Sequence, residues 1–270
     1  MSEDLRRACA FEEALREHCA ERILPLPWGR AVFSPGLNRV WELNVLRVER
    51  AGVSIDELIA EAERLQGEAG LAHRRIVVLD EDAGAALEPG FSERGWKTDS
   101  FVYMVHRGEP PARANSVRVE EVERRAVDPL REVIIRAEPW GNDDEVVRQL
   151  LVSSARVAEA GRGRQFAVLV NGRAVSAADL YSDERTAQIE DVATLPEHRG
   201  RGLATAVVLH ALAEAVDTGH ELVFLIADDK DWPKELYAKL GFELVGRKFA
   251  FLKPPAQASR ERTEPGGPGS

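Results

Sequence analysis

The chain has 270 residues, of which 44% are apolar and 30% are charged, and its formal net charge is −10. This length allows one large domain or two of ordinary size, and the composition is typical of a soluble globular protein. The acidic balance argues against a general nucleic-acid binder, because phosphate contacts need a basic face, and it is compatible with a cationic substrate. No apolar stretch approaches the roughly 20 residues that span a bilayer, so we expect no membrane contact.

The N-terminus and the two cysteines indicate a cytoplasmic protein. Residues 1–4 are acidic and lack the basic and apolar regions of a signal peptide. Cys9 and Cys19 lie ten residues apart in the first helical pattern, which is about 15 Å on a helix and too far for a disulfide. No histidines stand at metal-ligand spacing beside them, so we expect packing roles for both cysteines and no metal site.

The first half of the chain carries a mixed helix and strand pattern. Helical patterns occupy residues 5–20 and 54–66, apolar strands are expected at 75–79 and 100–106, and a short helical or looped stretch lies at 82–94. A polar segment containing two prolines predicts a linker at residues 109–115, and residues 254–270 are so poor in apolar residues that we expect a disordered tail. The predicted domains are therefore residues 1–108 and 116–253.

The second half predicts an α/β (α+β) fold with a mixed, mostly antiparallel sheet flanked by helices. Helices are expected around 132–137 and at 143–160, 202–217 and 233–240, and strands at 166–170, 174–181, 186–194, 222–227 and 243–252. Asn171-Gly172 predicts a two-residue hairpin. Both halves end in the order strand, helix, Gly-aromatic and strand (Gly95-Trp96 and Gly241-Phe242), which predicts a tandem duplication.

One segment between a strand and a helix carries a pattern suited to binding an anion. Gly200 and Gly202 permit backbone conformations that a Cβ would forbid and let a ligand approach closely. The first amides of the following helix have no internal partners, and the helix dipole adds positive charge there. A diphosphate would accept these hydrogen bonds, with Arg199 and Arg201 as counter-charges. By itself this pattern also fits an ordinary glycine-rich turn with solvated arginines.

The same segment resembles the acetyl-CoA signature R/Q-x-x-G-x-G/A of the GNAT superfamily of N-acetyltransferases, with Arg199, Gly202 and Ala204 at the defining positions. A strand ending V-x-x-x-P precedes it, and Leu-Tyr-Ala-Lys-Leu-Gly-Phe at 236–242 resembles a second motif of that family. The resemblance covers residues 116–253. It implies the GNAT fold, acetyl-CoA as cosubstrate and no metal, with a sheet that splays between the strand ending at Thr194 and the strand at 222–227. The implied cofactor contacts come mainly from the backbone of Val192, Ala193, Thr194, Arg199, Gly200, Arg201, Gly202, Leu203, Ala204 and Thr205.

The resemblance also implies catalytic residues. Tyr237 matches the tyrosine that protonates the departing CoA thiolate in the family. Glu190 and Asp191 precede the signature on the same strand, where alternation sends them to opposite faces. Glu190 has the family's spacing for a base acting through a water, whereas a bulge in this strand would favour Asp191. Either residue is alternatively an anchor for the substrate ammonium group.

The function that the resemblance implies is an acyl-CoA-dependent N-acyltransferase that moves acetyl to a primary amine of a small molecule or protein by direct attack in a ternary complex. A non-catalytic acyl-CoA sensor or interaction module is the alternative, and it would not need Tyr237 or Glu190. Other acyl groups, and a monomer or a homodimer, remain open. Lys230 stands where many family members have an asparagine, and Trp140 is a candidate for the acceptor-pocket wall. The first half lacks the signature, so we expect it to be a scaffold or an acceptor-site wall.

Overall fold

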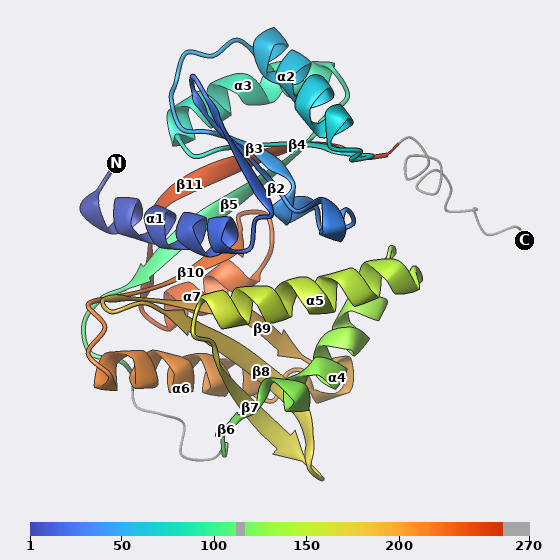
Figure 1. Cartoon of the computed structure of the whole chain (residues 1–270). Coiled ribbons are helices and arrows are strands. Elements are labelled where there is room, and N and C mark those ends of the chain that lie inside the picture. Colours follow the sequence, from blue (N-terminus) through green and yellow to red (C-terminus); the bar gives the residue numbers. More distant parts are fainter. Residues whose placement is uncertain (112–116, 256–270) are drawn as a thin grey trace, which may run out of the picture. The chain divides into compact units, whose positions relative to one another are not determined.

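The computed structural model describes residues 1–111 and 117–255, and it divides into two compact units. Unit 1 consists of Met1–Ala20 and Ser100–Arg247, and unit 2 of Glu21–Asp99 and the chain from Lys248 onward (Figure 1). Most of the predicted linker at 109–115 and of the predicted tail at 254–270 lies outside the described residues. Within the described ranges, no helix is long and apolar enough to cross a membrane.

The sheet of unit 1 has the strand order β5-β10-β9-β8-β7-β6. Its strands are β5 (Lys97–His106), β6 (Glu120–Val122), β7 (Arg164–Val170), β8 (Arg173–Ser182), β9 (Thr186–Thr194) and β10 (Leu222–Asp228). β9 and β10 run parallel, whereas the other neighbouring strands pair antiparallel. Asn171 and Gly172 have φ of 53° and 76° between β7 and β8, as a tight hairpin turn requires. The predicted mixed, mostly antiparallel sheet is confirmed.

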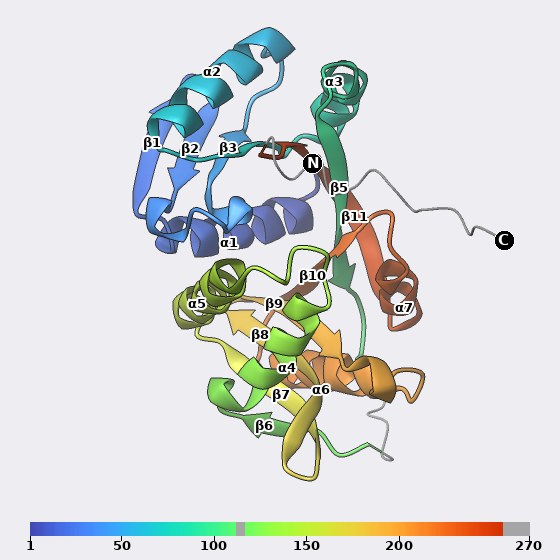
Figure 2. The ribbon, with the colours of Figure 1, turned by 90° about the vertical axis from the view of Figure 1, so that its right-hand side faces the viewer.

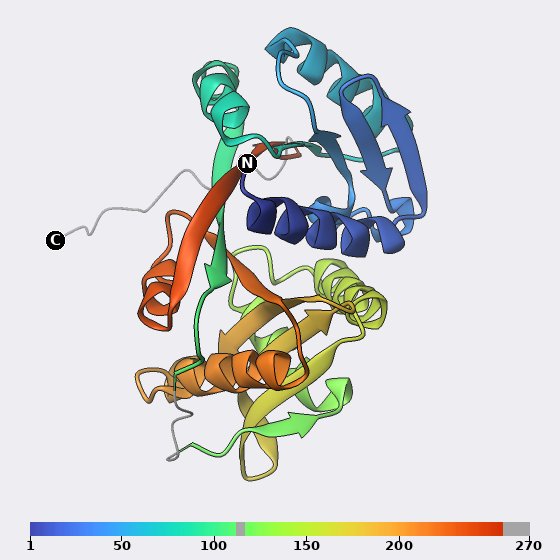
Figure 3. The same cartoon turned by 90° about the vertical axis from the view of Figure 1, so that its left-hand side faces the viewer.

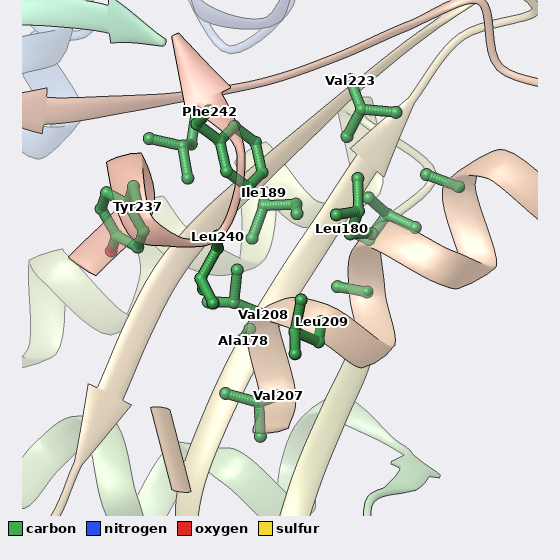
Figure 4. Packing of buried hydrophobic residues seen from close by; sticks show 14 of the residues in the cluster. Ala178, Leu180, Ile189, Val207, Val208, Leu209, Val223, Tyr237, Leu240 and Phe242 are labelled. Carbon is green, nitrogen blue, oxygen red and sulfur yellow. The ribbon is translucent and has the colours of Figure 1, made fainter. Parts of the chain in front are cut away.

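Helices cover both faces of this sheet (Figure 3). One face carries α1 (Glu3–His18), α4 (Arg124–Arg136) and α5 (Asp144–Ala160), and the other carries α6 (Leu203–Asp217) and α7 (Pro233–Lys239). α6 buries apolar side chains on most of its surface, and Val207, Val208 and Leu209 pack with Leu180 and Ile189 of the sheet (Figure 4). Each large apolar side chain buried in this way contributes about 1.5–3 kcal/mol, so the start of α6 is held firmly against the sheet.

Unit 2 is a smaller sheet with helices on one face (Figure 2). Its strand order is β1-β2-β3-β4-β11, formed by β1 (Arg22–Leu26), β2 (Gly29–Phe33), β3 (Val45–Val48), β4 (Arg74–Val78) and the end of β11 (Phe242–Lys253). α2 (Ile55–Glu68) and α3 (Glu81–Glu93) supply the helical side of the core. α3 packs so closely that a Cβ on Gly84 would lie 2.3 Å from Cδ2 of Phe249.

The two halves of the sequence repeat one topology, as the predicted duplication requires. In each half, antiparallel strands are followed by a helix, a strand parallel to the last one, a second helix and a long strand. The long strands are exchanged: β5 of the first half pairs with β10 in unit 1, and β11 of the second half pairs with β4 in unit 2. α1 also lies in unit 1. Each half of the sequence therefore contributes to both units.

Candidate active site

The two parallel strands of unit 1 separate before they end. β9 and β10 pair from Thr186 and Leu222 only as far as Ile189 and Leu225. Beyond this point β10 continues along β5 and β9 continues along β8 to Thr194. Within the described chain, the pairing register therefore gives the facing edges of the two strands no strand partner there. Backbone groups on such an edge can pair with an extended ligand as they would with another strand.

A β-bulge lies in the separated stretch of β9. The register with β8 shifts, so that Asp191 and Val192 together face Ala178. Asp191 has a φ of 52°, in the left-handed region that aspartate tolerates better than most residues. Simple alternation would send Glu190 and Asp191 to opposite faces of the sheet. The bulge instead places both carboxylates on the face that α4 and α5 cover, because it inserts one extra residue into the alternation.

A buried ion-pair network lies next to this bulge. Arg131 of α4 bonds to the carboxylate of Asp179 on β8, and only 8% and 0% of the two side chains are exposed. The hydroxyl of Tyr181 donates to the other oxygen of Asp179 at 2.9 Å. Nε of Arg131 lies 3.7 Å from Oδ2 of Asp191, which accepts a hydrogen bond of 3.3 Å from Ser154 Oγ on α5. Burial raises the pKa of Asp179 to about 6, although the Arg131 charge acts in the opposite direction.

Glu190 links this face of the sheet to α7. The side-chain amide of Gln188 donates a hydrogen bond to the Glu190 carboxylate, and Asp179 is the cross-strand partner of Glu190. Tyr237 of α7 is buried, and its pKa is raised to about 12 by that burial and then by the negative charges of Glu190 and Asp231. The phenol therefore keeps its proton at neutral pH. Thus Glu190 lies within electrostatic range of Tyr237.

The segment after β9 is a glycine-opened helix start. A short 3-10 turn at Pro196–His198 precedes Gly200 and Gly202, whose φ values are 73° and 72°. Gly202 is the N-cap residue of α6, no side chain caps this end, and the first turn contains no acidic residue. The first amides of α6 are therefore available to an anion, because a helix cannot satisfy them internally.

Arg199 and Arg201 are both exposed, and each donates a hydrogen bond to a backbone carbonyl at the end of β9 or in the segment between β9 and α6. Arg199 Nε donates to the carbonyl of Thr194 at 3.2 Å, and Arg201 Nη2 donates to the carbonyl of Glu197 at 3.1 Å. Together with the open helix start, these cations fit the pyrophosphate of CoA, and the unpaired edge of β9 fits the amide groups of its pantetheine arm. All the residues that the signature implies for CoA thus lie along one continuous stretch of unit 1.

The corresponding helix start in unit 2 is built differently. Ser54 caps α2 by accepting a hydrogen bond of 3.2 Å from the Glu57 amide, and Asp56 and Glu57 occupy the first turn. A bound phosphate would have to displace the cap and face two negative charges. Phe91 stands four residues before Gly95, as Tyr237 stands four residues before Gly241, and it stacks on Phe251 without a hydroxyl. Unit 2 therefore has neither an uncapped, glycine-opened helix start like that of α6 nor a hydroxyl at the position that corresponds to Tyr237.

Several other polar, aromatic and cysteine residues of unit 1 have local contacts or lie at the surface. Asp229 pairs with Lys234 and Arg247, both at 2.9 Å, and Asp231 accepts a hydrogen bond from the Trp232 amide at 2.8 Å, so the acidic run organises the start of α7. Trp140 is 44% exposed. His210 packs against Phe166 with ring centroids 5.0 Å apart, and Cys9 and Cys19 are free and buried.

Sequence reasoning missed Arg131, Asp179 and Tyr181. The available clue was an aspartate within the run Ala177-Ala178-Asp179-Leu180, because a carboxylate in a covered strand needs a partner. That partner lies 48 residues away on α4, so no local pattern could have identified it.

Part of the chain is similar to known proteins. Residues 127–242 match the model of the acetyltransferase (GNAT) family. Uncharacterized N-acetyltransferases of Mycobacterium tuberculosis and Mycobacterium bovis are 34% identical to the chain over 102 residues. That match spans 36% of this chain and 65% of those relatives.

Solved structures resemble the chain over nearly its full length. A protein of unknown function from Staphylococcus epidermidis has a TM-score of 0.70 and 17% identity, and the match covers 87% of this chain and 94% of that one. A GCN5-related N-acetyltransferase from Kribbella flavida has a TM-score of 0.63 and 18% identity, with 96% and 99% of the chains covered. At these identities the likeness concerns the fold, and it extends to both units.

Proposed function

We propose that the chain is an acyl-CoA-dependent N-acyltransferase that transfers acetyl from acetyl-CoA to a primary amine. One observation carries the proposal: β9 separates from β10 just before a glycine-opened, uncapped start of α6. The separated edge suits the pantetheine arm and the helix start suits the pyrophosphate. The GNAT domain match over residues 127–242 supports the same class of reaction.

The proposed reaction is a direct attack within a ternary complex. The amine nitrogen forms a bond to the acyl carbon, and the bond from that carbon to the CoA sulfur breaks. Glu190 receives the proton that the amine loses, directly or through a water. Tyr237 donates its proton to the departing thiolate, and its raised pKa keeps that proton in place until the thiolate forms.

We assign the base to Glu190 and not to Asp191. The charge of Glu190 acts on Tyr237, whereas Asp191 bonds to Ser154 and lies beside Arg131. The base must reach the amine nitrogen while the acid reaches the CoA sulfur at the same reacting centre, and of the two carboxylates only Glu190 acts on the pKa of Tyr237. Asp191 then remains available to bind the acceptor.

The test begins with thermal unfolding in the presence of acetyl-CoA and continues with free-thiol release across a panel of primary amines. We expect stabilisation by acetyl-CoA and amine-dependent thiol release, with intersecting double-reciprocal lines that distinguish a ternary complex from a covalent acyl-enzyme. Glu190→Gln should lower kcat by about 10²–10⁴-fold, and Asp191→Asn should act mainly through KM for the amine. Stabilisation without turnover of any amine would instead favour a non-catalytic acyl-CoA sensor.

A further inference from the structure

We propose that the acceptor of this enzyme is a dibasic amine, whose reacting nitrogen lies at Glu190 and whose second, cationic nitrogen binds Asp191. This inference rests on the proposed N-acyltransferase function and names the substrate class. It comes from the charges and from an unsatisfied polar atom on the face of β8 and β9 that α4 and α5 cover.

The first observation is an excess of negative charge on this face. The carboxylates gathered there are Asp128, Asp179, Glu190 and Asp191, and the guanidinium groups are Arg124 and Arg131. Arg131 lies within 4 Å of three of the four carboxylates, since its Nη1 is 3.6 Å from Asp128 and its Nε is 3.7 Å from Asp191. Arg124 pairs with Asp128 at 3.1 Å, so the two guanidinium groups leave two of the four carboxylate charges without a counter-charge on this face. A cationic ligand is therefore favoured there and a carboxylate ligand is disfavoured.

The second observation is a buried hydrogen-bond acceptor without a donor. Gln188 is 3% exposed, and its Oε1 atom is buried and accepts no hydrogen bond. Its amide nitrogen is fixed by the bond to Glu190, so the unsatisfied oxygen lies beside the proposed base. A buried acceptor left in this way costs about 1–3 kcal/mol, and the N–H groups of an amine held at Glu190 would satisfy it.

The third observation concerns the exposure and the position of the Asp191 carboxylate, which we assign to the second nitrogen. Asp191 is 41% exposed, unlike the buried Asp179, and the bulge and the Ser154 hydroxyl hold it in place. Among the described residues, no group of three or more His, Cys, Asp or Glu side chains could hold a metal ion. An accessible carboxylate held in this way suits an ammonium group, because a charge-assisted hydrogen bond to an ionised acceptor is stronger than one between neutral groups.

Three amines with four carbon atoms each test the proposal with the intact chain: 1,4-diaminobutane, butylamine and 4-aminobutanoate. They offer a positive, an apolar and a negative group at the far end, and kcat/KM is measured for each with acetyl-CoA, with calorimetric binding of each amine to the CoA complex as a second readout. We expect kcat/KM for the diamine to exceed that for butylamine by roughly 10- to 100-fold, the range expected for one hydrogen bond to a charged group, and 4-aminobutanoate to be the poorest.

Asp191→Asn should reduce the ratio of diamine to butylamine toward one. Asparagine tolerates the left-handed conformation as well as aspartate does, so this variant removes the charge and keeps the bulge. Glu221→Gln is the matched control, because it removes one negative charge at the opposite end of the strand pair, where Glu221 bonds to Arg7 and Arg185. That variant should leave the ratio unchanged.

The outcomes separate the two proposals. Equal or better use of butylamine or 4-aminobutanoate would overturn the dibasic acceptor and leave the N-acyltransferase function standing. A ratio that persists in Asp191→Asn would overturn the anchoring role of Asp191. If acetyl-CoA binds but the CoA complex neither binds nor acetylates the diamine, the inference is wrong. If acetyl-CoA fails to stabilise the chain, the proposed function is wrong as well.

Discussion

The glycine that opens α6 provides a sharp test of the phosphate loop. Gly202 has a φ of 72°, and a Cβ built on it would meet nothing within 4 Å. Gly202→Ala would therefore cause no clash within the protein. It would force an L-residue into the left-handed region, which costs about 1–2 kcal/mol. We expect the free energy of unfolding to fall by that amount, and the amides at the helix start to shift as the strain relaxes.

Gly172→Ala is a matched control for this change. Gly172 has a φ of 76° in the β7–β8 turn, again with nothing within 4 Å of a built Cβ. The two variants should lose similar stability in urea unfolding. Only Gly202→Ala should also weaken CoA binding. The loss of one hydrogen bond to a charged phosphate costs about 1.5–3 kcal/mol, or roughly 10- to 100-fold in Kd.

The assay is isothermal titration of CoA into each variant, with KM for acetyl-CoA as an independent measure. If Gly202→Ala loses stability like the control but binds CoA as tightly as the parent chain, the start of α6 does not hold the pyrophosphate. Equal weakening of CoA binding in both variants would show that strain anywhere in unit 1 affects the site, and the assignment of the pyrophosphate to this helix start would then be unsupported.

Three further predictions address the acid, the buried network and unit 2. Tyr237→Phe keeps the buried ring and removes the proton, so kcat should fall by about 10²–10⁴-fold with little change in Kd for CoA; full turnover would remove Tyr237 from the mechanism. Asp179 has a folded pKa of about 6, above its ordinary value of 3.8, so between these values the native state binds more protons than the unfolded state and its stability falls as pH rises. The free energy of unfolding of the parent chain minus that of Asp179→Asn should therefore drop by roughly 2 kcal/mol from pH 4 to pH 7, and a flat or rising difference in urea titrations would contradict this. Gly84→Ala should destabilise unit 2 by about 1–3 kcal/mol through the clash with Phe249, measured by thermal unfolding, and an unchanged unfolding temperature would show that the α3 packing relaxes freely.

The sequence predicted the elements whose signals are local. The helices at 144–160 and 203–217 follow from amphipathic or apolar periodicity, and the turn at Asn171-Gly172 follows from the need for positive φ. The strands between Arg22 and Val48 escaped prediction, because they are only four or five residues long and Pro25 lies inside the first of them. The loop from Arg199 to Ala204 was also accessible, since glycines that open a helix act through their own backbone.

Local patterns in the sequence were therefore enough to predict most of the secondary structure of the second half and the glycine-opened start of α6. They did not predict β6 or the first part of α4, and only the family resemblance singled out Tyr237. Tertiary structure decided which elements belong together: β5 and β11 are exchanged between the units, because strand pairing depends on partners far away in sequence. It also decided how the carboxylates are arranged. A single extra residue in β9 turns Asp191 to the side of Glu190, and the helix α4 brings Arg131 to Asp179. No local pattern encodes such a contact, because its energy arises only when two distant segments are buried against each other.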